Sequence, residues 1–362
     1  MGLIGSLLSL PYMLLFFAIW LIASLIRPLF LACIVNALTK PLATVRKLHL
    51  FKITVEYLLF CNDKKFQAPK EDPLSFFKDF DPKKGDTKTI IFVRHGESTW
   101  NDTFNRGDRS QFVFILYYIP NLIKSLYYEA SFFVTGQAQE SWFFDSPLSD
   151  KGLKQARGIA SFVQEANLDY MTPREADLIK HMRGNQPSTL VSSNLRRAIS
   201  TTAIGFQPRF AANPEERILI LPQLQEMSRN PDALCITPVQ GKIQRAWTDP
   251  DELEHLFATQ IDTQRHTGNK PVDSSGLVRM QDFCKIVFDD IEGGAVIAVG
   301  HSYWFRSFFK TYLPHDNDHV SKKKKLVNGG CVGFTMFRTL DEGTHTQYMI
   351  DPHSITILYG GF

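Results

Sequence analysis

Ionisable side chains follow four short apolar runs in this chain of 362 residues. Each run is rich in Val, Ile or Leu, which is typical of a buried strand. The residues that follow the four runs are Arg94 and His95, Arg196 and Arg197, Glu226, and Gly300 and His301. A single histidine after a strand is usually structural. Four strand ends that each deliver such a group predict one shared site at the carboxyl edge of a sheet.

These residue types suit chemistry on a phosphoryl group. Two arginines can bind phosphate oxygens bidentately and stabilise charge in the transition state. A neutral imidazole can attack phosphorus through one nitrogen while a hydrogen bond holds the other. A carboxylic acid can protonate the leaving oxygen and later deprotonate a water molecule. The residues that supply these parts, without a metal ion or another cofactor, are Arg94, His95, Arg197, Glu226 and His301.

The strands that must position these residues alternate with helical patterns. Candidate strands are residues 89–93, 188–193, 217–222 and 295–300, followed by β patterns at 331–340, 346–350 and 354–360. Candidate helices are residues 149–166, with Ser149 as N-cap, and residues 194–206, 251–264, 274–292 and 303–313. This alternation predicts an α/β fold in three layers, with a mostly parallel sheet and helices on both faces.

The N-terminal segment, residues 1–60, is predicted to anchor the chain in a membrane. Residues 3–26 contain no charged side chain and are long enough to cross a bilayer core. Arg27 and Pro28 then precede a shorter apolar run at residues 29–38. A single membrane helix and a helical hairpin both fit, and a hairpin packed on the domain is the alternative. The basic residues that follow place the rest of the chain in the cytosol by the positive-inside rule, with the organelle left open.

Charge and cysteine content exclude some classes of protein. The formal net charge of +3 implies no nucleic-acid partner. Five scattered cysteines without C-x-x-C spacing argue against a disulfide framework or a zinc site and favour a reducing compartment. The four lysines at residues 322–325 form either a solvated loop or a site of attraction for anionic head groups or an anionic substrate.

Five motifs, in order, carry a family resemblance. RHGESTWN at residues 94–101 resembles the signature of the histidine phosphatase superfamily, which has the phosphoglycerate-mutase-like fold. The supporting motifs are SPLSDKGLKQA (146–156), SSNLRRAISTTA (192–203), LQE (224–226) and VGHS (299–302). The resemblance covers roughly residues 88–362, apart from insertions.

The resemblance implies a role for each site residue. His95 would be the nucleophile that becomes phosphorylated, and Glu226 the proton donor. The residues that would bind the phosphoryl group are Arg94, Asn101, Arg197 and His301, with Asn101 as a helper. The motif selects Arg197 over Arg196 as the pocket arginine. The implied activity is that of a membrane-anchored, metal-independent phosphatase, a hydrolase that cleaves a phosphomonoester through a phosphohistidine.

The resemblance also divides the chain. Residues 61–88, rich in charge, proline and aspartate, are predicted as a linker, and residues 89–362 as the histidine phosphatase domain. An apolar insertion interrupts that domain at about residues 104–143. Its centre, residues 111–134, is aromatic and broken by Pro120. We expect this stretch to lie at the membrane interface or against the anchor, or alternatively to cap the site as a lid. Residues 3–38 and, as a further candidate, residues 111–134 are therefore the expected membrane contacts.

The residues after Glu226 depart from one branch of the family. MSRNPDALCITP stands where cofactor-dependent glycolytic mutases carry Glu-Arg-His-Tyr-Gly, which argues against glycolytic mutase activity. Two alternatives to a phosphatase stay open. One is a phosphotransferase or mutase with an unidentified substrate, and the other is a catalytically silent phosphate-binding module. The class of phosphorylated substrate is left open.

Overall fold

The computed structural model describes most of the chain. The described residues are 24, 27, 30, 31, 34, 35, 38–63, 66–78, 80–82, 85–135, 137, 139–340 and 346–362. The predicted membrane-spanning run at residues 3–26 lies almost wholly outside them. Within the described ranges, no helix is both long and apolar enough to cross a membrane.

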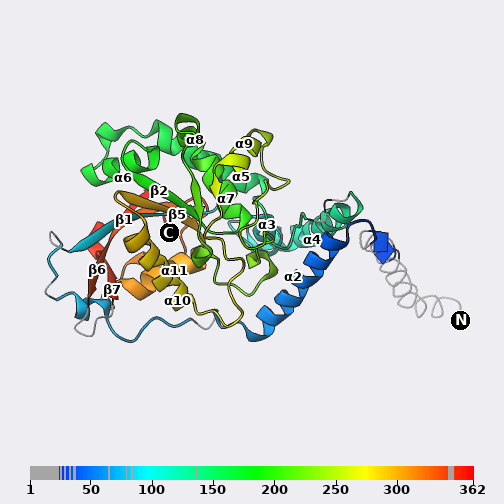
Figure 1. Cartoon of the computed structure of the whole chain (residues 1–362), viewed down its shortest axis with the longest axis horizontal. Coiled ribbons are helices and arrows are strands. Elements are labelled where there is room, and N and C mark those ends of the chain that lie inside the picture. Colours follow the sequence, from blue (N-terminus) through cyan, green and yellow to red (C-terminus); the bar gives the residue numbers. More distant parts are fainter. Residues whose placement is uncertain are drawn as a thin grey trace, which may run out of the picture.

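The described residues form one eight-stranded sheet (Figure 1). The strands are β1 Asp86–Arg94, β2 Ser188–Ser192, β3 Ile218–Ile220, β4 Ile261–Asp262, β5 Ala295–Gly300, β6 Cys331–Leu340, β7 Thr346–Ile350 and β8 Thr356–Tyr359. Their order is β4-β3-β2-β5-β1-β6-β7, with β8 also paired to β6. β1 to β5 pair in parallel, whereas β6 pairs antiparallel with β1, β7 and β8. The sheet is mixed, so the prediction of a mostly parallel sheet is wrong. No long helix separates the last three strands, and the chain therefore reverses between neighbours.

Helices cover both faces of the sheet, as the sequence predicts. The helices are α2 Pro41–Phe60, α3 Thr99–Phe104, α4 Gln111–Val134, α5 Asp150–Glu165, α6 Pro173–Arg183, α7 Arg196–Gly205, α8 Gln207–Ala212, α9 Glu254–Thr259, α10 Gly276–Lys285 and α11 Ser302–Tyr312. α10 and α11 pack on one face, and α5 to α9 on the other. Successive β1 residues alternate between these cores, with Phe92 in the first and Val93 in the second. This alternation fixes the register of the residues that follow β1.

The expected elements are largely confirmed. Ser149 caps α5 by accepting a hydrogen bond from Gly152 N, as predicted. The expected helix at residues 251–264 is partly wrong, because α9 ends at Thr259 and β4 follows it. A strand of two residues is too short to show a period in the sequence.

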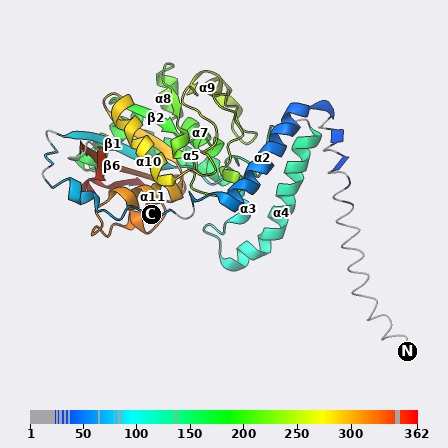
Figure 2. The same ribbon diagram turned by 60° about the horizontal axis from the view of Figure 1, so that its bottom comes forward.

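α2 and α4 lie side by side and project from the domain (Figures 1 and 2). Lys47 Nζ on α2 bonds Glu129 Oε1 on α4 at 2.8 Å. α4 continues through Pro120, so the prediction that this proline breaks the stretch is wrong. Proline removes one backbone donor from a helix. After the proline, Tyr128 stacks on Trp142 and Trp247, and before it Tyr118 contacts the Phe104 ring, so α4 is held on both sides of that loss.

Candidate active site

The hydrogen bonding of β1 extends as far as His95. Arg94 N donates to Gly330 O at 3.0 Å, and His95 N donates to Gly300 O at 3.1 Å. The chain then passes close to the start of α5. A Cβ added at Gly96 would lie 2.4 Å from the Gly152 carbonyl oxygen, so glycine is required there. The backbone that carries the His95 imidazole is thus held by strand hydrogen bonds at His95 and by close packing on α5 at Gly96.

The His95 ring is buried with its two nitrogens distinguished. Nδ1 lies 2.5 Å from Gly96 O, a contact that requires a proton on Nδ1. Nε2 then carries the lone pair and accepts from Arg197 Nε at 3.3 Å. Burial, and next the charges of Arg197 and Arg94, lower the pKa of His95 well below its usual value. The ring is therefore a neutral imidazole with a nucleophilic Nε2.

Arg197, in the first turn of α7, is held by Asp232 as well as by His95. Its Nη1 donates to Asp232 O at 2.6 Å, and Nη2 lies 3.3 Å from Asp232 Oδ2. Burial raises the pKa of Asp232 to about 6, with Glu226 adding to the rise, although Arg197 acts in the opposite direction. The Asp232 carboxyl group, which contacts Arg197, therefore changes its protonation state just below neutral pH.

Arg94 points a second guanidinium at the same space. Nη1 donates to Leu326 O at 2.6 Å, and Nε is buried without a hydrogen-bond partner among the described residues. Burial lowers the pKa of Arg94 to about 10, so the group stays cationic at neutral pH. A buried cation with an unused donor is suited to receive an anion.

Glu226 brings a carboxyl group to the same space as these arginines. Oε1 accepts hydrogen bonds from Met227 N at 2.8 Å and from Trp304 N at 3.3 Å. These two bonds orient the carboxyl group and involve one of its two oxygens.

His301 packs against His95, with 4.9 Å between ring centroids. Nε2 lies 2.8 Å from Ser193 Oγ, and Nδ1 has no partner within the described part of the chain. Burial first, then Arg197, lowers the pKa of His301. When the Ser193 hydroxyl donates to Nε2, Nδ1 carries the proton and is free to donate.

A cavity of about 640 Å³ joins most of these groups. Five of the six site residues expected from the sequence line it: Arg94, His95, Asn101, Arg197 and Glu226. His301 is absent from this lining, and it reaches the site through its contact with His95. Asn101 Oδ1 accepts from Asn105 Nδ2 at 2.9 Å.

The cavity also contains residues that sequence reasoning missed. Asp232 and Asn328 line it, and Asn328 Nδ2 donates to His95 O at 3.0 Å. Lys325 lies 3.7 Å from the centre of the Tyr303 ring, and both side chains line the cavity. The lysine run at 322–325 was the signal for Lys325. Asp232 and Asn328 belong to no motif that would have selected them.

Arg196 does not line the cavity, whereas Glu97 does. Arg196 is buried, with Nη1 on Glu140 Oε2 at 2.5 Å and its backbone N–H on Asp145 Oδ1 at 2.7 Å. It therefore fixes the start of α7. Glu97 Oε1 accepts from Ser149 Oγ at 3.1 Å and ties the loop after His95 to the cap of α5.

A buried ionic network supports the Glu226 loop from behind. Lys270 Nζ donates to the carbonyl oxygens of Glu226, at 2.7 Å, and Ser228, at 3.0 Å. Lys270 is also paired with Asp63, which accepts a second bond from Arg279 Nη2 at 2.9 Å. The Lys270 and Asp63 side chains are both fully buried. Residues 61–88, predicted as a linker, thus contribute one buried carboxylate to the support of the candidate acid.

Asp63→Asn is expected to lower the free energy of unfolding by about 3 kcal/mol, because two buried cations would lose their shared anion. Urea unfolding of the full-length protein in detergent measures this loss. The control is Asp273→Asn, the same change at an exposed site. A stability equal to that of the control would contradict the prediction. Turnover should also fall, since Lys270 would no longer be held against Glu226 O.

If His95 accepts a phosphoryl group, as the motif resemblance implies, the rate of that transfer is expected to stay constant as the pH falls through 6.5. The attacking form is neutral, and the lowered pKa of His95 keeps the imidazole neutral in mild acid. Protonation should reduce the rate only at lower pH. Single-turnover rates from pH 5 to 8, corrected for ionisation of the substrate phosphate, test this. A decline with a midpoint near the ordinary histidine value would mean that the ring titrates as in water.

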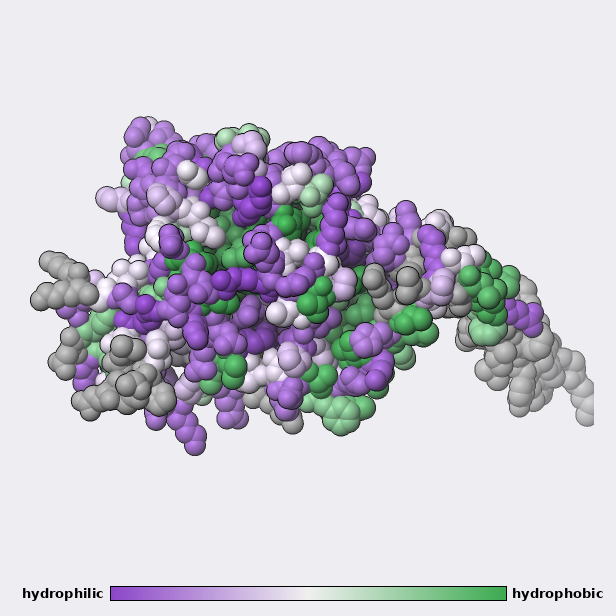
Figure 3. Space-filling view, in the orientation of Figure 1, coloured by the Kyte–Doolittle hydropathy of each residue, from purple (hydrophilic) through white to green (hydrophobic). Residues whose placement is uncertain are grey.

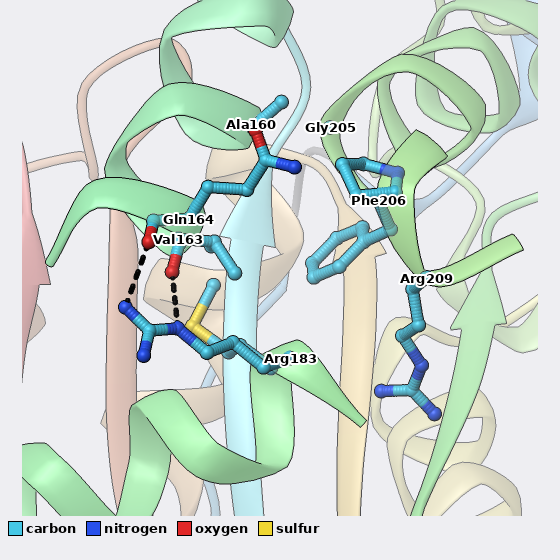
Figure 4. A pocket seen from close by; sticks show the side chains of 9 residues that line it. Ala160, Val163, Gln164, Arg183, Gly205, Phe206 and Arg209 are labelled. Atoms are coloured by element: carbon cyan, nitrogen blue, oxygen red, sulfur yellow. Dashed lines mark hydrogen bonds between the residues drawn. The ribbon is translucent and has the colours of Figure 1, made fainter. Parts of the chain in front are cut away.

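A second pocket lies apart from these residues, between α5, α6 and the α7–α8 corner (Figure 4). Arg183 beside it donates to Val163 O at 2.6 Å and to Gln164 O at 3.0 Å. Arg209 is committed to Glu216 and Ser188. These cations are already paired, so the pocket adds nothing to the site. Among the described residues, no cluster of three or more His, Cys, Asp or Glu is placed to hold a metal ion.

No protein-family model and no curated protein matches the chain. Solved structures similar to it include a mycobacterial glucosyl-3-phosphoglycerate phosphatase, at 15% identity over 73% of this chain and 97% of that one, with a TM-score of 0.34. A phosphoserine phosphatase from Entamoeba histolytica matches at 13% identity over 75% and 96%, with a TM-score of 0.32. A phosphoglycerate mutase from Bacillus anthracis matches at 14% identity over 75% and 94%, with a TM-score of 0.34. The neighbours are phosphatases and mutases, but identities and TM-scores this low assign neither a family nor an activity to the chain.

Proposed function

We propose that the protein is a metal-independent phosphomonoesterase that works through a phosphohistidine on His95. The observation that carries the proposal is the state of His95. Its neutral ring presents Nε2 to a cavity that also contains two guanidinium groups and a carboxyl group. The motif resemblance agrees with this reading.

In the first step, His95 Nε2 attacks phosphorus and the bond from phosphorus to the ester oxygen breaks. Arg94 and Arg197 bind the non-bridging oxygens, whose charge they stabilise in the transition state. The phosphoryl oxygens compete with the Asp232 carboxylate for Arg197 Nη2. Glu226 gives its proton to the departing oxygen, which leaves as an alcohol.

In the second step, water attacks the phosphohistidine. Glu226, now a carboxylate, removes a proton from that water as the phosphorus–nitrogen bond breaks. Inorganic phosphate leaves, and His95 and Glu226 return to their starting protonation states. His301 Nδ1, which has no partner among the described residues and lies beside the His95 ring, is the donor proposed for an oxygen of the phosphoryl group on His95. The lowered pKa values of both histidines support these roles. A neutral His95 has a free lone pair on Nε2 for the attack on phosphorus.

The protein works, in this proposal, attached to a membrane through residues 3–38, with the catalytic domain on the cytosolic side. The uncharged run at residues 3–26 and the basic residues after it support this location.

The test uses full-length protein in detergent with p-nitrophenyl phosphate and excess EDTA. We expect chelator-resistant phosphate release, together with an acid-labile, base-stable phosphoenzyme after rapid quenching. Turnover that EDTA abolishes, without any phosphoenzyme, would contradict the proposal. Added glycerol, as an alternative acceptor to water, distinguishes a hydrolase from a phosphotransferase. A glycerol phosphate yield that exceeds phosphate release would identify a phosphotransferase in place of a hydrolase.

A further inference from the structure

α4 leaves an apolar stripe uncovered. Six large aliphatic or aromatic residues, each between 53% and 75% exposed, recur at spacings of three and four: Phe112, Ile115, Leu116, Ile119, Ile123 and Leu126. This spacing places all six on one side of the helix. Isolated exposed apolar residues are common on proteins, but a continuous stripe of six marks a surface that something covers.

The charged residues of α4 lie off this stripe. Glu129 faces α2 and the domain, where it binds Lys47 Nζ at 2.8 Å and accepts from Trp142 N at 2.8 Å. The Lys124 ammonium lies over the Trp142 ring, 5.5 Å from its centre. Both charges are therefore engaged with the protein. The stripe itself contains no group that needs water.

α2, which lies beside α4 (Figure 2), carries a second row of exposed apolar side chains. Its members are Val45, Leu48, Phe51, Leu58 and Leu59, each between 52% and 66% exposed. Figure 3 shows hydrophobic side chains gathered over α2, whereas most of the remaining surface in this view is hydrophilic. The stripe and this row together are called the α2–α4 face.

The chain that leads into this face identifies what covers it. Phe30, Leu31, Val35 and Leu38, just before α2, are all at least half exposed. Residues 3–26, further upstream, contain no charge and are long enough to span a bilayer. The first acidic residue of the whole chain is Glu56, whereas basic residues occur from Arg27 onward. Apolar surface with basic flanks matches a bilayer that contains anionic lipid better than it matches a second copy of the chain.

We propose that the α2–α4 face docks on the surface of a lipid bilayer. Tyr117 and Tyr127, both more than half exposed on α4, then lie at head-group level, where tyrosine is favoured. Lys52, whose exposed side chain pairs with Glu56 at 3.7 Å, reaches the anionic head groups. The inference uses no residue of the cavity, and it stands or falls independently of the proposed chemistry.

Docking would also orient the catalytic cavity. Trp100, Asn105 and Asp108 line the cavity, and α4 begins at Gln111. The wall that contains Asn101 thus continues directly into the docked helix. The cavity mouth would open beside the head groups, within reach of a phosphate ester held at the membrane.

The experiment places a fluorophore on the face in the full-length protein. Ile119→Cys, in a Cys33→Ser background, is labelled with a nitrobenzoxadiazole probe. The other cysteines, Cys61, Cys235, Cys284 and Cys331, are buried. The matched control is Tyr170→Cys, at a side chain that is 90% exposed in the short 3₁₀ helix between α5 and α6. Both proteins are reconstituted into nanodiscs of phosphatidylcholine and phosphatidylserine, with and without 5-doxyl phosphatidylcholine.

The expected result is loss of probe emission in doxyl-containing discs at position 119, with no loss at position 170. Equal emission at position 119 in both kinds of disc would overturn the inference. Mass photometry of the same samples counts protein copies in each disc. Two copies in a disc, with position 119 shielded from doxyl lipid and from aqueous iodide, would assign the face to a second copy and would also overturn it.

Discussion

Replacing His95 by alanine is expected to lower kcat by about 10⁴-fold or more and to abolish phosphoenzyme formation. His95 Nε2 carries an imidazole lone pair that accepts from Arg197 Nε, and the ring lines the cavity. Removing the imidazole leaves Arg94, Arg197 and Glu226 in place, so the variant should still bind phosphate. Rapid-quench labelling and steady-state phosphate release measure the two losses. Isothermal titration with inorganic phosphate measures the retained binding.

The matched control is His353→Ala, the same substitution at an exposed histidine. It should leave both turnover and labelling unchanged. Circular dichroism of both variants checks that each is folded. Retained labelling in a folded His95→Ala protein would mean that another residue accepts the phosphoryl group. Loss of phosphate binding together with turnover would point to a structural role for the ring.

The strands that meet at the sheet edge could be predicted from the sequence. β5 and the buried parts of β1 and β2 contain short apolar runs because helices cover both faces of the sheet there, and such runs stand out in a sequence. Parallel strands end at the same edge, so Arg94 and Arg197 could be expected to meet there without knowledge of any contact. The structure brings them together with His95 at that edge.

The remaining site residues depend on contacts that a linear pattern does not record. Asn328 reaches His95 O across 233 residues, and Asp63 reaches Lys270 across 207. Neither residue is part of a periodic pattern, and each is common in surface loops. The sequence did not predict a mixed sheet for a similar reason. β6 is as apolar as a parallel strand, and only its partners show its direction.

The ionic network around Asp63 connects the α2–α4 face with the cavity that contains Glu226. Tyr57, near the end of α2, hydrogen bonds Lys270 O, and Lys270 holds the carbonyl oxygen of Glu226. α2 is also one half of the α2–α4 face. A shift of α2 would therefore reach the backbone of the candidate acid through two side chains, those of Tyr57 and Lys270. This connection makes the position of Glu226 sensitive to how α2 is seated.

Glu226→Gln is expected to slow hydrolysis of an alkyl phosphate by about 10²- to 10⁴-fold, because an alkoxide must be protonated as it leaves. The same variant should lose much less with p-nitrophenyl phosphate, whose phenolate leaves without a proton. The ratio of the two losses measures proton donation to the leaving oxygen. Steady-state kcat for both substrates, taken at the same pH, supplies that ratio.

Asp232→Asn is the control that separates proton donation from positioning of Arg197. Asp232 is a second carboxyl group in the cavity, and a pKa of about 6 would allow it to donate a proton. Its bonds run to Arg197, however, so its expected function is to position that guanidinium. Positioning affects both substrates equally, whereas proton donation affects the alkyl ester alone. A loss confined to the alkyl ester in Asp232→Asn, with an even loss in Glu226→Gln, would exchange the two roles.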